Sequence, residues 1–227
     1  MIFRQLQDPV SSTYTYVLGT APGGDAVIID PVREQAQRDL ALIGELGLRL
    51  RWIVETHVHA DHVTGAQALK ERTGAQTSVS RQCGATGFDR MLEDNDAIVF
   101  GDQSLRVIAT PGHTPGSSCF LWHDRLLTGD TLLIGGCGRT DFQQGDAIAL
   151  YESITQRLFT LPDDTLVYPG HDYRGRRVST IAEERATNPR LAGVSREEFV
   201  RIMANLDLPP PQRMGEAVPA NLRAGGH

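Results

Sequence analysis

The sequence predicts a single α+β domain over residues 1–227, in which two β-sheets pack face to face and helices cover their outer sides. The strand-like segments come in two runs, each followed by helical segments, which favours a four-layer αββα sandwich over an alternating βαβ sheet. The length of 227 residues suits one such domain, and no linker or low-complexity stretch divides the chain. Polar residues that can bind metals follow the ends of the predicted strands, as expected of a rigid scaffold that carries a site on its loops.

The first run of elements begins with the alternating, aromatic and β-branched segment Thr13–Leu18, which predicts a strand. The turn residues PGGD and the apolar segment Ala26–Ile29 follow, and together they predict a hairpin. Apolar spacing and a terminal glycine then mark helices. The remaining predicted elements of this run are the helix Gln35–Leu46, the strand Leu50–Val54 and the helix Thr64–Arg72.

The second run contains more short strands, and its helices come late in the chain. Predicted strands are Leu105–Ala109, Ser118–Trp122, Arg125–Leu127 and Leu166–Tyr168. Predicted helices are Ala147–Leu158, Ser179–Arg185 and Ser195–Asn205. From about residue 208, the sequence LPPPQ and the polar residues after it predict an irregular tail.

Composition narrows the possible partners and the compartment. The net charge of -6 and the pI of about 5.6 do not suggest a basic face for nucleic acid, and no apolar run is long enough to span a membrane. The N-terminal residues lack the pattern of a signal or transit peptide. Three cysteines without CxxC spacing, Cys83, Cys119 and Cys137, predict free thiols in a reducing compartment. We therefore expect a cytoplasmic bacterial protein or a mature organellar one.

The stretch ETHVHADHVTG (residues 55–65) places four potential metal ligands within six positions: His57, His59, Asp61 and His62. Further candidates follow other predicted strands: Asp30, His113, Asp130 and His171. If these strand ends share one edge, five histidines and two or three aspartates converge on one pocket. Imidazole and carboxylate without cysteine suit Zn, Fe, Mn, Ni or Cu. The two other histidines, His123 and His227, are interpreted as ordinary core or surface residues.

Position relative to a helix predicts the charge state of one candidate ligand. His62 lies just before the predicted helix Thr64–Arg72. The partial positive charge at a helix N-terminus disfavours an imidazolium there, so His62 is expected to be neutral.

The motifs HxHxDH, PGHTPG, TGD and PGHDY, in this order, resemble the metallo-β-lactamase superfamily, whose αββα sandwich carries a metal site along one edge. Within it, the segments at 128–146, 159–175, 179–191 and 197–212 resemble the persulfide dioxygenases, the family affected in ethylmalonic encephalopathy. The similarity runs from FRQLQDPVSSTYTY to AVPAN. The chain is too short for the helical glutathione-binding domain that follows the sandwich in glyoxalase II enzymes.

The persulfide dioxygenase resemblance implies one Fe(II) per chain, held by His57, His113 and Asp130 as a facial triad with open positions for substrate and oxygen. Four motif residues would surround these ligands and orient them: His59, Asp61, His62 and His171. Asp30 is expected to brace the motif loop by accepting backbone hydrogen bonds. The implied reaction converts glutathione persulfide, O2 and water to glutathione and sulfite, and the resemblance makes a homodimer plausible.

Substrate contacts are expected from Arg139 in GCGRTDF and from Tyr173 after His171-Asp172, with a structural salt bridge and loop packing as their alternative roles. The basic run of Arg174, Arg176 and Arg177 is interpreted as solvated, and Cys137 as a buried, inert thiol.

Two other functions compete with the dioxygenase interpretation. One is a dinuclear zinc hydrolase of glutathione thioesters, similar to glyoxalase II, because the residues themselves do not exclude a second metal. The other is a non-catalytic metal-binding or thiol-binding protein, which the complete ligand set disfavours.

Overall fold

Two six-stranded β-sheets form the centre of the computed structural model, which describes residues 1–226. The first sheet contains, in spatial order, β1 (Ile2–Gln7), β2 (Tyr14–Gly19), β3 (Asp25–Ile29), β4 (Arg49–Val54), β5 (Gln76–Ser80) and β6 (Arg90–Leu92). Strands β1 to β3 pair antiparallel, and β3 to β6 pair parallel. The antiparallel pairing of β2 with β3 confirms the predicted hairpin.

The second sheet has the order β14-β13-β10-β9-β8-β7. Its strands are β7 (Ala97–Phe100), β8 (Gln103–Ala109), β9 (Ser118–Trp122), β10 (Arg125–Gly129), β13 (Leu166–Pro169) and β14 (Ser179–Thr180). Only β10 and β13 pair parallel among the described residues of this sheet. A short hairpin of β11 (Leu132–Leu133) and β12 (Gly136–Cys137) follows β10.

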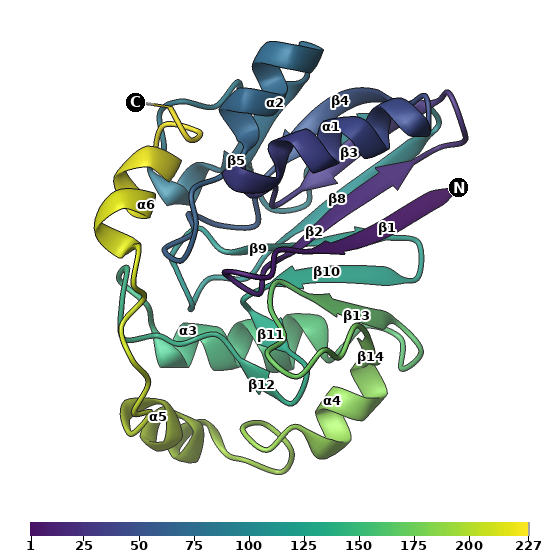
Figure 1. Ribbon diagram of the computed structural model, residues 1–227. Helices are drawn as coiled ribbons and strands as arrows, with labels where there is room; N and C mark the ends of the chain where they lie inside the picture. The colour runs from purple at the N-terminus through teal and green to yellow at the C-terminus, as the bar shows by residue number, and fades with distance from the viewer. Residues whose placement is uncertain (227) are drawn as a thin grey trace.

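Helices cover both outer faces of the paired sheets (Figure 1). Helices α1 (Ala36–Glu45) and α2 (Ala66–Thr73) lie on the first sheet. The second sheet carries α3 (Ala147–Glu152) with its π-helical continuation Ser153–Leu158, α4 (Ile181–Thr187) and α5 (Arg196–Ala204). Short 3₁₀ turns occur at Arg33–Gln35 and Arg81–Cys83. This arrangement confirms the predicted αββα sandwich, and none of the helices within residues 1–226 is both long and apolar enough to cross a bilayer.

Alternating side chains explain why a strand between a sheet and a helix layer is buried on both faces. On β2, Tyr16 and Leu18 point into the core between the sheets, where they meet Trp122 and Phe120 of the second sheet. Val17 points the other way and packs under the helices of the first sheet. The period of two in a β-strand produces this division, and it makes the whole of β2 buried.

The C-terminal segment differs from its prediction. The residues from about 208 were expected to be irregular, yet they contain helix α6 (Met214–Asn221). This helix is short and has Pro219 inside it, so its sequence carries little helical signal. Packing supports it instead, because Ala217 and Asn221 are buried and Ala224, just after the helix, belongs to the core under α1 and α2.

One buried carboxylate predicts a pH-dependent stability. Asp39 on α1 is fully buried and pairs with Arg38, and burial raises the pKa of Asp39 to about 6. Because the folded-state pKa exceeds the unfolded one, this group stabilises the fold below about pH 4 and loses that contribution as the pH rises through 6. We expect Asp39→Asn to raise the free energy of unfolding by about 1–3 kcal/mol at pH 7.5.

Urea unfolding of Asp39→Asn and the wild type at pH 7.5 and pH 4 measures this difference. The gain is expected to vanish at pH 4, where the wild-type carboxyl is also neutral. Asp124→Asn is the control, because Asp124 is exposed and its loss has little effect on stability. Equal gains for Asp39→Asn at both pH values would contradict the assignment.

Candidate metal centre

Four loops that follow strand ends meet at one edge of the sandwich. His57 comes after β4 of the first sheet, whereas His113 and Asp130 come after β8 and β10 of the second sheet. His171 follows β13, and the parallel pairing of β10 with β13 brings His171 and Asp130 to the same edge. The convergence of strand ends that the sequence predicted is therefore realised by residues from both sheets.

His57, His113 and Asp130 form one compact group of potential ligands. Each offers one ligand atom, and the three atoms lie within 4.8 Å of one another. His113 Nε2 is 3.7 Å from Asp130 Oδ2, and the rings of His57 and His113 stand at 84° to each other. These three atoms are close enough together to hold one cation.

Hydrogen bonds fix which ring nitrogen of each histidine faces this group. The hydroxyl of Thr56 donates its proton to Asp30 Oδ2 at 2.8 Å, so Thr56 Oγ1 itself accepts the proton of His57 Nδ1 at 2.9 Å. His113 Nδ1 donates to the backbone carbonyl of Arg139 at 2.7 Å. Both Nε2 atoms therefore keep their lone pairs for a ligand, as in metal-bound histidines oriented by the surrounding protein.

Electrostatics keeps His57 neutral. Burial lowers the pKa of His57 well below its ordinary value, and His59 and His113 lower it further. A neutral imidazole is the form that binds metal. Two imidazole nitrogens and one carboxylate thus fit a divalent transition metal such as iron or zinc.

A second group of potential ligands, His59, Asp61 and His62, lies beside the first. Asp61 Oδ2 accepts hydrogen bonds from His62 Nδ1 at 2.9 Å and from Thr13 Oγ1 at 3.0 Å. His171 Nε2 lies 3.6 Å from an oxygen of Asp61 and 3.6 Å from an oxygen of Asp130. In this structure Asp61 and His62 bind each other and the surrounding protein.

The neutral state predicted for His62 arises mainly from burial, and not from the helix N-terminus to which the prediction attributed it. Burial is the largest reason that the pKa of His62 falls, and the nearby His59 lowers it further, while Asp61 opposes both. The helix after it begins at Ala66, farther from His62 than the prediction placed it.

His59 is held by two buried carboxylates. Its Nε2 lies 3.1 Å from Asp30 Oδ1 and 3.3 Å from Glu55 Oε2. Burial opposes a charge on His59, but Asp30 and Glu55 raise its pKa well above the ordinary value. Asp30 Oδ1 also accepts the backbone N–H of Thr56 at 2.7 Å, which is the geometry of a brace for the motif loop.

Arg139 does not present a free cation to the site. Its guanidinium binds both carboxylate oxygens of Asp141 at 2.6 and 2.7 Å and donates to the carbonyls of Leu208 and Pro209. Its backbone carbonyl holds His113. These bonds match the alternative role, a structural salt bridge, and the substrate contact stays a prediction.

Tyr173 lies at the surface beside the centre. Its ring is 77% exposed and stacks nearly parallel to His171, with ring centroids 6.0 Å apart. This position leaves Tyr173 accessible to a substrate that approaches His171.

The basic run beyond Tyr173 is exposed to solvent, as predicted, although two of its arginines also bind the protein. Arg176 pairs with buried Asp172 at 2.8 Å and donates to the carbonyl of Ile134. Arg177 donates to the side chain and the carbonyl of Gln5. Two of the three arginines therefore tie their loop to the protein, an arrangement that the charge pattern alone did not reveal.

Sequence reasoning missed three residues that hold the motif loop: Thr56, Glu55 and Asn221. Thr56 and Glu55 stand inside the motif stretch itself, so their position beside His57 was an available signal. Asn221 donates to the carbonyls of His59 and His62, which are about 160 residues earlier in the sequence. No local sequence pattern predicts such a contact.

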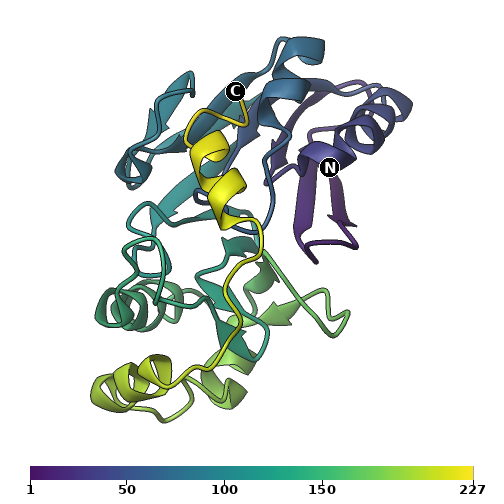
Figure 2. The ribbon, with the colours of Figure 1, turned by 60° about the vertical axis from the view of Figure 1, so that its left-hand side comes forward.

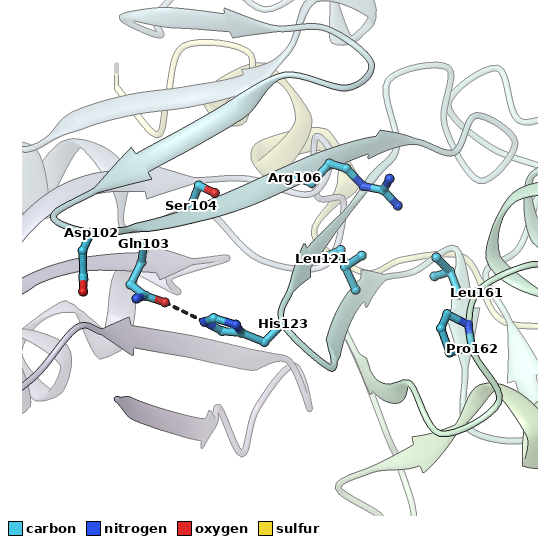
Figure 3. Close-up of a pocket in the computed structure, with 8 residues that line it drawn as sticks. All are labelled: Asp102, Gln103, Ser104, Arg106, Leu121, His123, Leu161 and Pro162. Atoms are coloured by element: carbon cyan, nitrogen blue, oxygen red, sulfur yellow. Dashed lines mark hydrogen bonds between the residues drawn. The ribbon is translucent and has the colours of Figure 1, made fainter.

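A pocket elsewhere on the surface is separate from this centre. It is lined by the start of β8, the end of β9 and the turn at Leu161 and Pro162 (Figure 3). His113 follows the opposite end of β8, so the pocket lies at the far end of these strands. His123 binds Gln103 there at 2.6 Å, in keeping with its interpretation as an ordinary residue, and His227 lies outside the described residues.

The fold and the group of metal-binding side chains define a metalloenzyme of the metallo-β-lactamase superfamily. The sequence model of that superfamily, described as "Metallo-beta-lactamase superfamily", matches residues 8–171. Human mitochondrial persulfide dioxygenase ETHE1 is 54% identical over 228 residues, covering 99% of this chain and 89% of the human protein. The crystal structure of ETHE1 from Myxococcus xanthus matches with a TM-score of 0.97 and 54% identity, over 99% of this chain and 100% of that one.

These likenesses place the chain more narrowly within the superfamily. It belongs to the persulfide dioxygenase family. A hydroxyacylglutathione hydrolase from Anaeromyxobacter dehalogenans is 43% identical, but over only 162 residues, 70% of this chain and 61% of the hydrolase. The glyoxalase II-like alternative is thus supported only by a partial match.

Proposed function

We propose that this protein is a mononuclear Fe(II) persulfide dioxygenase that oxidises glutathione persulfide to sulfite. The observation that carries the proposal is the compact group of His57, His113 and Asp130, whose ligand atoms lie within 4.8 Å of one another. Two imidazoles and one carboxylate on one side of an iron leave its other positions for substrate and oxygen. The 54% identity to human persulfide dioxygenase over 99% of this chain supports the substrate class.

The proposed reaction balances without a further cosubstrate. Glutathione persulfide, O2 and water give glutathione, sulfite and two protons, and the persulfide sulfurs supply all the electrons that reduce O2. Bound iron supplies the redox chemistry that joins oxygen to sulfur. The chain itself positions the reactants: Thr56 and the Arg139 carbonyl orient the two imidazoles, and exposed Tyr173 contributes to placing the substrate beside His171.

Contacts within the neighbouring group support a single metal. Asp61 Oδ2 already accepts hydrogen bonds from Thr13 and His62, and His59 Nε2 lies beside the carboxylates of Asp30 and Glu55, although it makes no hydrogen bond. In this arrangement the three motif residues His59, Asp61 and His62 surround the iron ligands and orient them.

Metal counting combined with oxygen uptake tests the proposal. We expect the protein purified without added metal to contain about one iron per chain, and to consume O2 when glutathione persulfide is added. Glutathione itself, which lacks the outer sulfur, serves as the control substrate and is expected to cause no uptake. Two metals per chain, with cleavage of a glutathione thioester and no oxygen uptake, would establish the dinuclear hydrolase instead.

The thiols support a reducing compartment, such as a bacterial cytoplasm, as the proposed location. Cys83, Cys119 and Cys137 are all free, and burial raises the pKa of Cys83 to about 12 and that of Cys119 to about 11. The buried Cys137 is held beside Arg190 and Met203, which fits an inert thiol. The homodimer stays a prediction, which light scattering would test.

A further inference from the structure

The C-terminal chain crosses the sandwich and ends on the metal side of the first sheet. After α5 it runs along the edge of the molecule to α6, which lies beside α2 (Figures 1 and 2). This segment lies beyond residues 8–171, the part that the superfamily model matches. Its end contacts the loop that carries the HxHxDH motif.

Asn221, the last residue of α6, makes these contacts with every hydrogen-bonding group of its side chain. Its Nδ2 donates to the carbonyls of His59 at 2.9 Å and His62 at 2.8 Å. Its Oδ1 accepts the backbone N–H of Thr64 at 2.9 Å. The side chain is buried, so water does not replace these bonds.

The start of α2, directly after the motif, depends on the same segment. The residue before the helix, Gly65, has no side chain to cap it. The Ala66 N–H is satisfied by Thr64 Oγ1, and the Gln67 N–H by the carbonyl of Ala224 at 3.0 Å. The C-terminal segment thus supplies partners that the first turn of a helix otherwise lacks.

The motif loop needs such partners because it is irregular and buried. Residues 57–63 form neither helix nor strand, and His57, His59 and His62 are each at most 2% exposed. Buried backbone groups in irregular segments must bind side chains or water. Asn221 satisfies three of these groups with one rigid amide, and so fixes the path of the loop between His57 and α2.

We propose that Asn221 is a positioning residue of the metal centre, which holds the motif loop so that His57 keeps its place relative to His113 and Asp130. It touches neither the metal nor the substrate and acts through the loop backbone. The inference rests on the proposed metal centre. It assigns a part in that centre to the AVPAN segment at the C-terminal end.

The test compares metal binding by the wild type, Asn221→Asp and Asn221→Ala. The aspartate keeps the acceptor for Thr64 but places a carboxylate oxygen against two carbonyls, whereas alanine removes all three bonds. We expect both variants to bind Fe(II), measured anaerobically by competition with a chelator, about 10-fold to 100-fold more weakly than the wild type. The rise in melting temperature that metal produces is expected to shrink as well, because this stabilisation depends on the logarithm of the metal affinity.

Asn188→Ala is the matched control. Asn188 is also a buried asparagine, and it donates to Gly136 and Glu184 and accepts from Arg190. We expect this control to lower the melting temperature equally with and without metal, and to change the affinity for Fe(II) less than about twofold.

Wild-type affinity and an unchanged metal-dependent rise in melting temperature in both Asn221 variants would overturn the inference. If these variants do not fold, Asn221→Ser, which replaces the amide with one smaller hydrogen-bonding hydroxyl, is measured in the same way and the same outcomes decide. This test does not depend on the proposed activity. If the wild type bound metal but did not oxidise persulfide, the proposed function would fail, and the metal affinities of the variants would still test the role of Asn221.

Discussion

Asp130→Ala is expected to leave the purified protein nearly free of iron and to abolish persulfide oxidation. Asp130 supplies the only carboxylate among the three described residues of the ligand group, and its removal leaves two imidazoles, which bring no negative charge to hold a divalent cation. Because changes outside the ligand set already weaken metal binding about 10-fold to 100-fold, removal of a ligand is expected to exceed 100-fold. Elemental analysis and oxygen uptake measure both effects.

His62→Ala is the control for Asp130→Ala. Under the one-metal proposal His62 is not a ligand, so this variant is expected to retain most of its iron. A dinuclear site would instead lose about one of its two metals. Stoichiometric iron in Asp130→Ala would contradict the assignment of the ligands.

Gly138→Ala is expected to disrupt the metal centre without removing any ligand. A Cβ at Gly138 would lie 2.2 Å from the backbone oxygen of Asp130 and 2.9 Å from the ring of His113. Both distances are shorter than van der Waals contact, so two of the three proposed ligands must move. Because small displacements of catalytic groups reduce rates about 100-fold, we expect at least that loss of activity, together with weaker iron binding.

Gly136→Ala tests whether this effect is specific to the position. A Cβ at Gly136, in strand β12 just before Gly138, would meet its nearest atom, in the Arg190 side chain, at 4.0 Å. This control is expected to keep wild-type iron content and activity. Equal losses of iron and activity in the two variants would show that this segment tolerates no side chain at either position. The effect of Gly138→Ala would then not come from a clash with His113 and Asp130.

The strands were predictable from the sequence where aromatic and β-branched residues alternate with other residues, and less so elsewhere. Thr13–Leu18 predicted β2 within one residue at each end, because its aromatic and β-branched side chains fill both adjacent layers. Strand β5 (Gln76–Ser80) was missed, because its sequence QTSVS is polar and its burial comes only from its place in the sheet. Helix α6 was missed for the same reason: its packing against distant residues, rather than its own sequence, supports it.

The candidate site likewise has features that the sequence predicted and features that it did not. The positions of the histidines and aspartates after predicted strands indicated that they would share one edge if the strand ends did. The choice of His57, His113 and Asp130 among them came from the resemblance to the persulfide dioxygenases. The pairing of Arg139 with Asp141 depends on rotamers and on the path of the C-terminal chain. Charge and motif position suggested a substrate contact for Arg139, and they did not reveal its ion pair with the exposed Asp141.

The distribution of the ligands over both sheets has a consequence for slow motions of the protein. His57 follows a strand of the first sheet, and His113 and Asp130 follow strands of the second, so a metal bound by all three cross-links the two halves. Separation of the sheets then requires that at least one bond to the metal break. Opening of the sandwich and release of the metal become a single event, and removal of the metal should speed amide hydrogen exchange in the inner strands of both sheets together.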